Sequence, residues 1–427
     1  MSSGPETHHA RLRVLICAYA CNPYKGSEEG VGWGWVKAIS EHHDLWVITG
    51  LEQGKDDIER YLSTTDDLSG RVHFVYVQRR MGPRCLRHFP PYYFWTYRRW
   101  QKRAYRVAQE LCRSINFDLV HQLTWVSFRV PGYLWKLDKP FVWGPVGGLE
   151  NTAWRLAGAM DLRGSCHYCA RNVVNVMHKV LLLGPRQAFK AAQGGIIAAS
   201  EATRMQIQRW YGVDSQVVSE IGVSAIRSCQ VVRNHNEPLR VSWSGSHFPG
   251  KALPFLLSAC SRLDPKCNWR LDILGDGPYR SQWQSLARQL RVDCNCNWHG
   301  HLPKKDAMSV IRRSHVFVIT SIKDLTSSVL LESLSQGVPV VCLDHCGFRD
   351  VVTDKCGIKI QPLNKRQIEV ALAAAIERLA KDEPFRRVLA TGASKRAEDF
   401  LWEKKGLIIN QIYESKLRQS ALPGITP

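Results

Sequence analysis

The sequence lacks any apolar run long enough to cross a membrane, since no stretch approaches the roughly eighteen apolar residues that a spanning helix needs. We expect no secretory leader, because residues 1–10 are polar and the apolar run at residues 14–20 is typical of a first strand. We therefore expect a protein that starts in the cytosol and makes only peripheral contact with a membrane.

Acidic side chains are scarce, since 38 Asp and Glu stand against 58 Lys and Arg, which gives a formal net charge of +20. This balance favours an anionic partner: nucleic acid, a membrane surface or a phosphate-bearing small molecule. Composition does not choose among the three. The length of 427 residues, with 44% of them hydrophobic, predicts a globular chain of two domains.

The fourteen cysteines lack the spacing of a metal site. Cys166 and Cys169 form one Cys-x-x-Cys with His167 between them, but Cys294 and Cys296 do not supply a matching second pair. Scattered thiols in a cytosolic chain are usually small buried hydrophobes. We therefore expect no metal site.

Short apolar runs alternate with helix-like stretches in both halves of the chain. In the first half, strands are predicted at residues 13–19, 44–49, 72–77, 119–121, 140–143 and 195–200. In the second half, they are predicted at residues 239–245, 270–275, 296–298, 316–320 and 338–343. Helices are predicted at residues 34–42, 254–263, 280–290 and 400–416. Short β-branched strands separated by helices are typical of parallel sheets that are covered on both faces.

This alternation predicts an α/β protein with two Rossmann-like domains that face a central cleft. Residues 212–233 are polar and lack a long helical period, so the hinge is expected there. We predict one domain over residues 1–215 and a second domain over residues 216–400. The C-terminal helix and tail, residues 401–427, either complete the second domain or cross back to the first.

Two glycine-bearing segments follow predicted strands. Residues 25–32 contain three glycines, which let backbone amides approach an anion, although a plain tight turn explains this segment about as well. Residues 245–251 follow a strand and open a helix, and Lys251 at their end suits a diphosphate. The dinucleotide fingerprint Gly-x-Gly-x-x-Gly is absent, which disfavours a dehydrogenase.

The most informative segment is residues 320–340, where a strand ends, a loop carries Asp324 and a helix is expected to begin near residue 326. Ser327 and Ser328 are expected to cap that helix. Glu332 lies one turn beyond Ser328 on the same face, where a carboxylate can accept both hydroxyls of a ribose. Taken alone, the segment favours a capped core helix that carries a solvated glutamate.

The ordered motifs of the second half resemble glycosyltransferase family four, the large retaining GT-B family also called glycosyl transferases group 1. They are Gly-Asp-Gly-Pro at 275–278, Trp-His-Gly at 298–300, Asp324 and Glu332 at Glu-x7-Glu spacing, Cys-Gly-Phe-Arg-Asp-Val-Val at 346–352 and Cys-Gly at 356–357. The first half adds the loop at 26–32, Asp-Leu-Val-His at 118–121 and Ala-Ser-Glu-Ala-Thr at 199–203. Several motifs in the family's order are more specific than any one of them.

The resemblance implies that the domain over residues 1–215 binds the acceptor and that the domain over residues 216–400 binds the nucleotide sugar. It also implies a role for each matching residue. The donor diphosphate would contact Lys251, Ser246, Gly30, Ser327 and Ser328. The transferred sugar would contact Asp324, Leu325 and Thr326, the ribose would contact Glu332, and the base would contact Trp298, His299, Gly300 and His301. The co-substrate would be a nucleotide-diphosphate sugar, with no cofactor and no metal, because lysine and helix amides supply the charge stabilisation.

Three departures from the family pattern bear on this site. The first glutamate of the pair is Asp324, which is shorter by one methylene. The arginine that usually follows the glycine of the phosphate loop is Ser246. Many members have a histidine near the reacting carbon, where this chain has Trp-Gly-Pro-Val-Gly-Gly at residues 143–148, and His121 cannot simply take that role. The catalytic base is therefore left unassigned.

A basic, aromatic stretch without acids lies between Arg79 and Arg106. Its other basic residues are Arg80, Arg84, Arg87, Arg98, Arg99, Lys102 and Arg103, and its aromatic residues include Phe89, Tyr92, Tyr93, Phe94, Trp95, Tyr97 and Trp100. A second basic, apolar stretch covers residues 163–190. Such stretches suit an anionic membrane, but a solvated helix with an aromatic core side explains them too.

Both stretches fall in the half expected to bind the acceptor. We therefore hypothesise a glycan or lipid-linked acceptor at the inner face of the cytoplasmic membrane, in surface polysaccharide biosynthesis. A nucleotide-sugar epimerase or a phosphorylase shares the architecture but lacks this order of motifs. A nucleic-acid-binding protein is suggested by charge alone, with no zinc module, helix-turn-helix or RNA-binding aromatic motif, so we expect no nucleic-acid partner.

Overall fold

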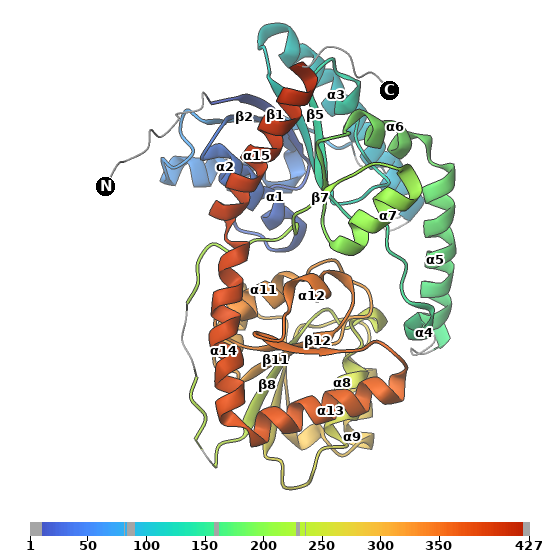
Figure 1. Cartoon of the computed structure of the whole chain (residues 1–427), viewed down its shortest axis with the longest axis vertical. Helices are drawn as coiled ribbons and strands as arrows, with labels where there is room; N and C mark the ends of the chain where they lie inside the picture. Colours follow the sequence, from blue (N-terminus) through green and yellow to red (C-terminus); the bar gives the residue numbers. More distant parts are fainter. Residues whose placement is uncertain are drawn as a thin grey trace.

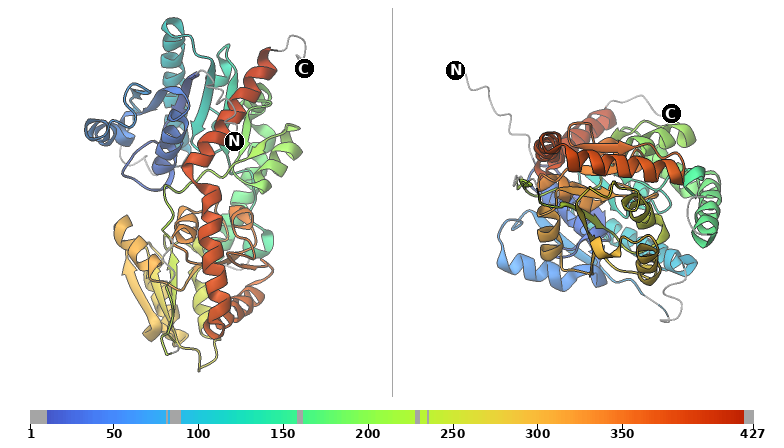
Figure 2. Two further views of the ribbon diagram at one scale, coloured as in Figure 1. Left: turned by 60° about the vertical axis from the view of Figure 1, so that its left-hand side comes forward. Right: turned by 90° about the horizontal axis from the view of Figure 1, so that it is seen from below.

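The computed structural model describes residues 11–80, 82, 90–157, 162–227, 231–234 and 236–421. Two α/β domains lie one above the other, and the last helices run along one side of both (Figures 1 and 2). The prediction of two Rossmann-like domains is confirmed. The last helix crosses back and packs on the first domain, which resolves the alternative left open by the sequence.

The first domain is built on a seven-stranded parallel sheet of order β3-β2-β1-β4-β5-β6-β7. Its strands are β1 Arg13–Ala18, β2 Asp44–Gly50, β3 Val72–Val77, β4 Leu119–Thr124, β5 Phe141–Val146, β6 Ile196–Ala198 and β7 Gln216–Val217. Its helices are α1 Ser27–Ser40, α2 Leu51–Thr64, α3 Pro90–Ser114, η2 Leu134–Lys136, α4 Trp154–Ala157, α5 Leu162–Leu181, α6 Leu183–Ala191 and α7 Glu201–Tyr211. All six predicted strands are present, and the two-residue β7 was not predicted.

The second domain is built on a six-stranded parallel sheet of order β10-β9-β8-β11-β12-β13. Its strands are β8 Leu239–Ser244, β9 Trp269–Leu274, β10 Cys296–Gly300, β11 Val316–Ile319, β12 Val340–Leu343 and β13 Gly357–Ile360. Its helices are η3 Pro249–Lys251, α8 Leu253–Cys260, α9 Arg280–Gln289, η4 Asp293–Asn295, α10 Lys304–Arg312, α11 Ser328–Ser335, α12 Cys346–Val351, α13 Lys365–Lys381 and α14 Glu383–Ala397. The chain continues through η5 Glu398–Phe400 into α15 Trp402–Ala421.

The burial of the central strands explains why the sequence pattern predicted them. Every residue of β4, β5, β11 and β12 is buried, as expected for strands covered by helices on both faces. One apolar cluster joins residues of both sheets along the hinge side and includes Val14, Leu330 and Val340. The two domains therefore share part of their core.

Helix α1 begins at Ser27, so the prediction of a loop at residues 26–32 with a helix from residue 34 is wrong. The glycines serve close packing inside the helix. A Cβ atom on Gly32 would lie 1.9 Å from the carbonyl oxygen of Ala20, and one on Gly34 would lie 2.3 Å from the Trp402 ring. Trp402 is the first residue of α15 and also meets Gly222 of the hinge, so these glycines let three segments converge.

Helix α3 holds most of the basic, aromatic stretch, and part of the stretch is core. Tyr97 and Trp100 are fully buried, so the idea that the aromatic rings as a group face a membrane is wrong for these two. Arg79 is also buried, and its guanidinium donates to the Tyr19 hydroxyl at 2.9 Å. Phe94 and Trp95 are exposed. Residues 84, 87 and 89 of this stretch lie outside the described residues.

No helix in the described ranges is both long and apolar enough to span a bilayer. Within the same residues, no group of three or more His, Cys, Asp or Glu side chains is arranged to hold a metal ion. The division of the chain between residues 215 and 216 stays a prediction. The last strand of the first sheet, Gln216–Val217, begins one residue beyond it.

Candidate functional site

The predicted site loops lie at a topological switch point. Strand order reverses between β1 and β4 in the first sheet and between β8 and β11 in the second. Ligands of open α/β sheets bind in the crevice outside the carboxyl ends of the strands at such a point. The loops that leave β8 and β11 are residues 245–252 and 320–327, so they meet at one crevice.

The loop after β8 is fixed to the loop after β11 by buried hydrogen bonds. Trp243 Nε1 donates to Thr320 Oγ1 at 3.0 Å, and that hydroxyl donates to the carbonyl oxygen of Lys251 at 2.8 Å. Lys251 Nζ lies 2.5 Å from Asp324 Oδ2. The ammonium expected at the diphosphate thus meets the carboxylate expected at the sugar. Ser246, in the same loop, is exposed.

The loop before α11 is held by carboxylates, and the prediction that Ser327 and Ser328 cap the helix is wrong. Ser327 occupies the N-cap position, but its side chain makes no capping hydrogen bond. Asp324 Oδ1 accepts the amide of Leu325 at 3.1 Å, and Glu220 Oε1 accepts the amide of the buried Thr326 at 2.8 Å. Because Glu220 comes from the hinge, the hinge itself shapes the entry to α11.

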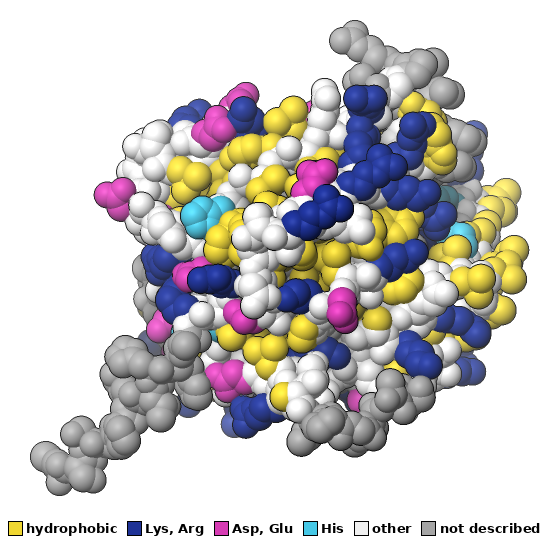
Figure 3. Space-filling view, turned by 90° about the horizontal axis from the view of Figure 1, so that it is seen from above, with side chains coloured by type: hydrophobic (Ala, Val, Ile, Leu, Met, Phe, Trp, Pro, Cys, Tyr) yellow, Lys and Arg dark blue, Asp and Glu magenta, His cyan; other side chains and the backbone are white. Residues whose placement is uncertain are grey.

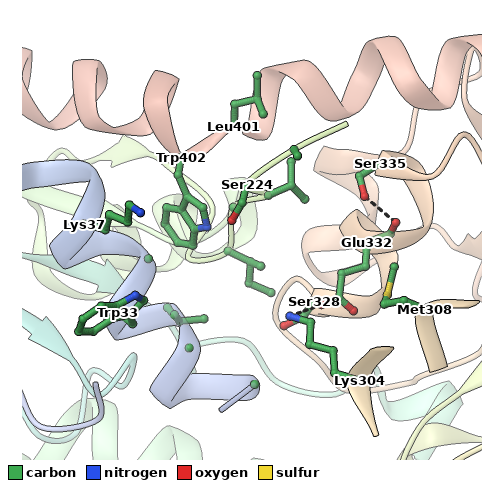
Figure 4. A pocket seen from close by; sticks show the side chains of 18 of the residues that line it. Trp33, Lys37, Ser224, Lys304, Met308, Ser328, Glu332, Ser335, Leu401 and Trp402 are labelled. Carbon is green, nitrogen blue, oxygen red and sulfur yellow. Dashed lines mark hydrogen bonds and ion pairs between the residues drawn. The ribbon is translucent and has the colours of Figure 1, made fainter. Parts of the chain in front are cut away.

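A cavity of about 1060 Å³ opens between the domains beside these loops. Its walls come from α1, the hinge, α10, α11 and Trp402 (Figure 4). Gly30 lines it from the first domain, while Ser328 and Glu332 line it from the second. Glu332 Oε1 pairs with Lys304 Nζ at 3.0 Å. Three of the predicted donor residues therefore share one cavity.

The four residues predicted to line the base lie elsewhere. Trp298, His299 and Gly300 belong to β10, the edge strand of the second sheet, and His301 follows it; the cavity lining includes none of these described residues. His299 Nε2 lies 2.7 Å from Asp272 Oδ1. The Trp298 ring lies 5.8 Å from the ring of His247. The structure thus groups this segment with the loop after β8 and not with Glu332.

The first-domain wall meets the second domain through backbone groups of residues 147–150. Lys323 Nζ donates to the carbonyl oxygen of Glu150. A Cβ atom on Gly147 would lie 2.8 Å from the Leu325 side chain, so glycine permits this contact. Burial lowers the pKa of Lys323, which the Glu150 carboxylate opposes. These contacts join the loop that carries Asp324 to the first domain, which is expected to bind the acceptor.

Buried charged groups gather under the cavity at the hinge. Glu220 is 5% exposed, and burial raises the pKa of its carboxyl to about 7. Lys405 of α15 is 2% exposed, burial lowers its pKa to about 7, and its ammonium donates to the carbonyl oxygen of Ser219 at 2.6 Å. Glu28 of α1 accepts the amide of Val126 at 2.8 Å, and burial raises its pKa to about 7. Glu220 and Lys405 thus tie the hinge to the entry of α11 and to α15, and Glu28 ties α1 to the loop after β4.

His121 serves structure. It is fully buried, and burial lowers its pKa to about 4, which keeps the ring neutral. Its Nε2 lies 2.8 Å from the Gly144 carbonyl oxygen, which can only accept, so this nitrogen carries the proton. The Tyr413 hydroxyl, 2.6 Å from Nδ1, then donates to it. The ring fastens α15 to the first sheet, which agrees with leaving it out of the catalytic role.

Sequence reasoning missed several residues of this region. Glu28 and Lys323 lie within segments that were already singled out, so their neighbourhood was a usable signal. His247 lies in the loop after β8, is fully buried and has both ring nitrogens without a partner, among the rings of Trp243, Trp283 and Trp298. The sequence around Glu220 does not indicate its role, because the residues that surround its side chain come together only in the folded protein.

Comparison with known proteins gives one family match. Residues 230–396 match the model of glycosyl transferases group 1. A curated relative is the putative colanic acid biosynthesis glycosyltransferase WcaL of Salmonella typhimurium, 25% identical over 191 residues, which are 43% of this chain. The chain spans about half (47%) of the length of that relative.

Solved structures resemble the whole chain. Sucrose-phosphate synthase from Thermosynechococcus elongatus has a TM-score of 0.65 and 16% identity, with 96% of this chain and 100% of that chain covered. The HepE protein of Anabaena, solved in complex with UDP, has a TM-score of 0.58 and 15% identity, again with 96% of this chain and 100% of that chain covered. At such identities the likeness shows the fold, which is the GT-B fold of two facing Rossmann-like domains.

Proposed function

We propose that this chain is a retaining, metal-independent glycosyltransferase, because residues 230–396 match the model of glycosyl transferases group 1. It moves a sugar from a nucleotide-diphosphate sugar to a glycan or lipid-linked acceptor. The observation that carries the proposal is the meeting of Lys251 with the entry to α11 at the switch point of the second sheet. An ammonium beside the first amides of a helix is a site for a diphosphate.

In this proposal the two ion pairs of the second domain exchange partners when the donor binds. The diphosphate contacts Lys251, with Ser246, Gly30, Ser327 and Ser328 around it. Asp324 then becomes available to the hydroxyls of the transferred sugar, beside Leu325 and Thr326. Both groups of the Lys251–Asp324 pair are partly exposed, so the pair is weak enough to exchange.

The nucleoside contacts the remaining predicted residues. Glu332 accepts the ribose hydroxyls after it separates from Lys304, whose side chain is 71% exposed. Trp298, His299, Gly300 and His301 bind the base. These residues lie on β10 while Glu332 lies on α11, so the nucleoside would run from the cavity toward the edge of the second sheet.

The chemistry is an exchange at the anomeric carbon of the donor sugar. The bond from that carbon to the diphosphate breaks, and a bond to an acceptor hydroxyl forms on the same face. The acceptor proton passes to the leaving phosphate oxygen, so we assign no protein base. Lys251 and the first amides of α11 stabilise the charge that develops on the diphosphate.

The acceptor binds against the first domain, near the wall at residues 147–150. We propose a surface-polysaccharide setting at the inner face of the cytoplasmic membrane, with the protein cytoplasmic and peripheral. The net charge of +20 supports attraction to anionic lipid. WcaL carries colanic acid biosynthesis in its name, which supports the setting and leaves the acceptor of this chain to experiment.

Thermal-shift measurements with UDP-, GDP-, ADP- and TDP-sugars, without added metal, test the donor site. We expect one nucleotide class to raise the melting temperature of the wild type and to raise that of Glu332→Ala much less. Glu110→Ala is the matched control, because Glu110 is exposed on α3 and away from the cleft. If no nucleotide stabilises the wild type, the proposal fails.

Product analysis tests the reaction type. Nuclear magnetic resonance of the product is expected to show the anomeric configuration of the donor on the acceptor. Inversion at that carbon would contradict the retaining proposal. Release of an isomeric nucleotide sugar without transfer would identify an epimerase instead.

A further inference from the structure

Helix α5 carries its polar residues inward and its apolar residues outward. Asn172, Asn175 and Lys179 are almost completely buried. The apolar residues of its outer face are between 45% and 80% exposed: Leu162, Val173, Val174, Met177, Val180 and Leu181. An ordinary surface helix has the opposite arrangement. The outer face of α5, defined by these six residues, is therefore an apolar surface that none of the described residues covers.

Two of the inward polar residues, Asn172 and Asn175, hold residues 149–152, at the end of the wall at residues 147–150. The Asn172 side chain exchanges two hydrogen bonds with the backbone of Thr152, at 2.9 and 2.8 Å. Asn175 Nδ2 donates to the carbonyl oxygen of Leu149 at 3.0 Å, and Arg129 donates to Asn175 Oδ1. Because these bonds fix α5 in its orientation, its outer face cannot simply turn inward.

The helix also reaches the second domain. A Cβ atom on Gly250 would lie 1.9 Å from the Tyr168 hydroxyl, so α5 touches the residue next to Lys251. Leu156 of α4, just before α5, belongs to the apolar cluster of the second domain. In Figure 1, α5 lies on the outer side of the molecule and extends from one domain toward the other.

The charges around the outer face identify its partner. No acidic residue occurs from Leu162 to Ser200, while Arg163, Arg171, Arg186 and Lys190 are exposed along the same stretch. Seen from above, hydrophobic side chains crowd the edge on which α5 lies in Figure 1, with Lys and Arg beside them (Figure 3). A second copy would bring like charges together, whereas an anionic lipid surface offers both apolar chains and negative charge.

We propose that the outer face of α5 is the surface by which this protein docks on an anionic lipid bilayer. Its inner face then holds residues 149–152, at the end of the wall at residues 147–150, at a fixed distance from the lipid. That this arrangement presents a lipid-linked acceptor to the cleft rests on the proposed function. The docking itself does not.

Flotation with vesicles tests the docking, in the absence of donor and acceptor. We expect the full-length wild type to float with phosphatidylcholine–phosphatidylglycerol vesicles and to bind phosphatidylcholine vesicles at least about tenfold more weakly. The double variant Val173→Glu/Met177→Glu should lose anionic-vesicle binding by about tenfold or more. Val388→Glu is the matched control, because Val388 is 64% exposed on α14, and it should bind as the wild type does.

Three results would overturn the docking proposal. They are a wild type that does not float with anionic vesicles, a double variant that floats as well as Val388→Glu, and a wild-type dimer in sedimentation velocity that the double variant dissociates without any vesicle binding. Thermal shift by the nucleotide sugar that stabilises the wild type checks that the double variant is folded. The same measurement separates the two proposals, because a wild type that floats but that no nucleotide sugar stabilises overturns the proposed function alone.

Discussion

Charged groups of two kinds surround the cleft, and they differ in burial. The pairs Lys251–Asp324 and Lys304–Glu332 belong to the second domain and are partly exposed. Glu220 and Lys405 belong to the hinge and to α15, and water reaches almost none of either side chain. Exposed pairs gain little from each other and can exchange partners, whereas buried charges are held in place by the hydrogen bonds around them. The comparison separates groups suited to bind a ligand from groups suited to hold the fold.

The largest expected effect tests the exposed groups, which we expect to bind the donor. Lys251→Met should weaken donor affinity by about 10- to 100-fold, because hydrogen bonds to charged groups contribute about 1.5–3 kcal/mol. The free energy of unfolding should stay within about 1 kcal/mol of the wild type, since the pair with Asp324 is partly exposed. Calorimetric titration with the stabilising nucleotide sugar and urea unfolding measure the two quantities. Lys266→Met, at an exposed position of the second domain, should change neither.

The next effect tests the buried groups, which we expect to stabilise the fold. Glu220→Leu removes the acceptor of the buried Thr326 amide and should lower the free energy of unfolding by about 1–3 kcal/mol. Glu220→Gln keeps an acceptor and should stay closer to the wild type. Urea unfolding at one pH compares the two variants. Equal stability of Glu220→Leu and the wild type would contradict the assignment of a holding role.

The free energy of unfolding should depend on pH in a way that the shifted pKa values of the buried groups predict. The folded-state pKa of Glu220 is raised from 4.5 to about 7, so the folded chain keeps a proton that the unfolded chain loses in that window. This lowers the free energy of unfolding as pH rises from about 4.5 to 7. Glu28 acts in the same direction. Lys405, with its pKa lowered from 10.5 to about 7, makes stability rise with pH between about 7 and 10.5.

Unfolding curves at several pH values isolate these contributions by difference. Relative to the wild type, Glu220→Gln should gain stability as pH rises from 5 to 7, because it lacks the titrating carboxyl. The free energy of unfolding of Lys405→Met, relative to that of the wild type, should fall as pH rises from 7 to 10, because the variant lacks the titrating ammonium. Parallel pH profiles for the wild type and both variants would show that neither group is buried as described.

The smallest effect is expected at Lys304. Its side chain is 71% exposed, so Lys304→Met should change the free energy of unfolding by less than about 1 kcal/mol. Donor affinity should change by less than about threefold, because the proposal needs Glu332 to leave Lys304 in any case. A loss as large as that of Lys251→Met would give Lys304 a direct role in donor binding and would blur the distinction between the two pairs.

The sequence predicted what depends on local pattern. Strands such as Val72–Val77 were found at their full extent, because a β-branched apolar run bounded by polar residues has few other structures. The placement of Asp324 and Glu332 around one helix start also followed from local spacing. The four-residue β13 was not predicted as a strand, because Gly357–Ile360 is short and only partly apolar.

What the sequence did not predict depends on contacts between distant segments. Gly34 was predicted to follow a loop because the partner that requires a glycine there is Trp402, which is more than three hundred and fifty residues away in the chain. The role of Glu220 follows from Thr326, and the inverted burial of α5 follows from Thr152 and Arg129. In the sequence, polar residues that face inward cannot be told from solvent-exposed ones, because their hydrogen-bond partners belong to distant segments.

The return of α15 to the first domain has a consequence for how the chain is made. Ile409, Ile412 and Tyr413 lie in the same apolar cluster as Val14 and Ile39, and the Tyr413 hydroxyl donates to His121. These residues leave the ribosome only after the entire second domain. The first domain is therefore synthesised first but completed late, and during that interval its face under α15 is open to chaperones or to wrong contacts.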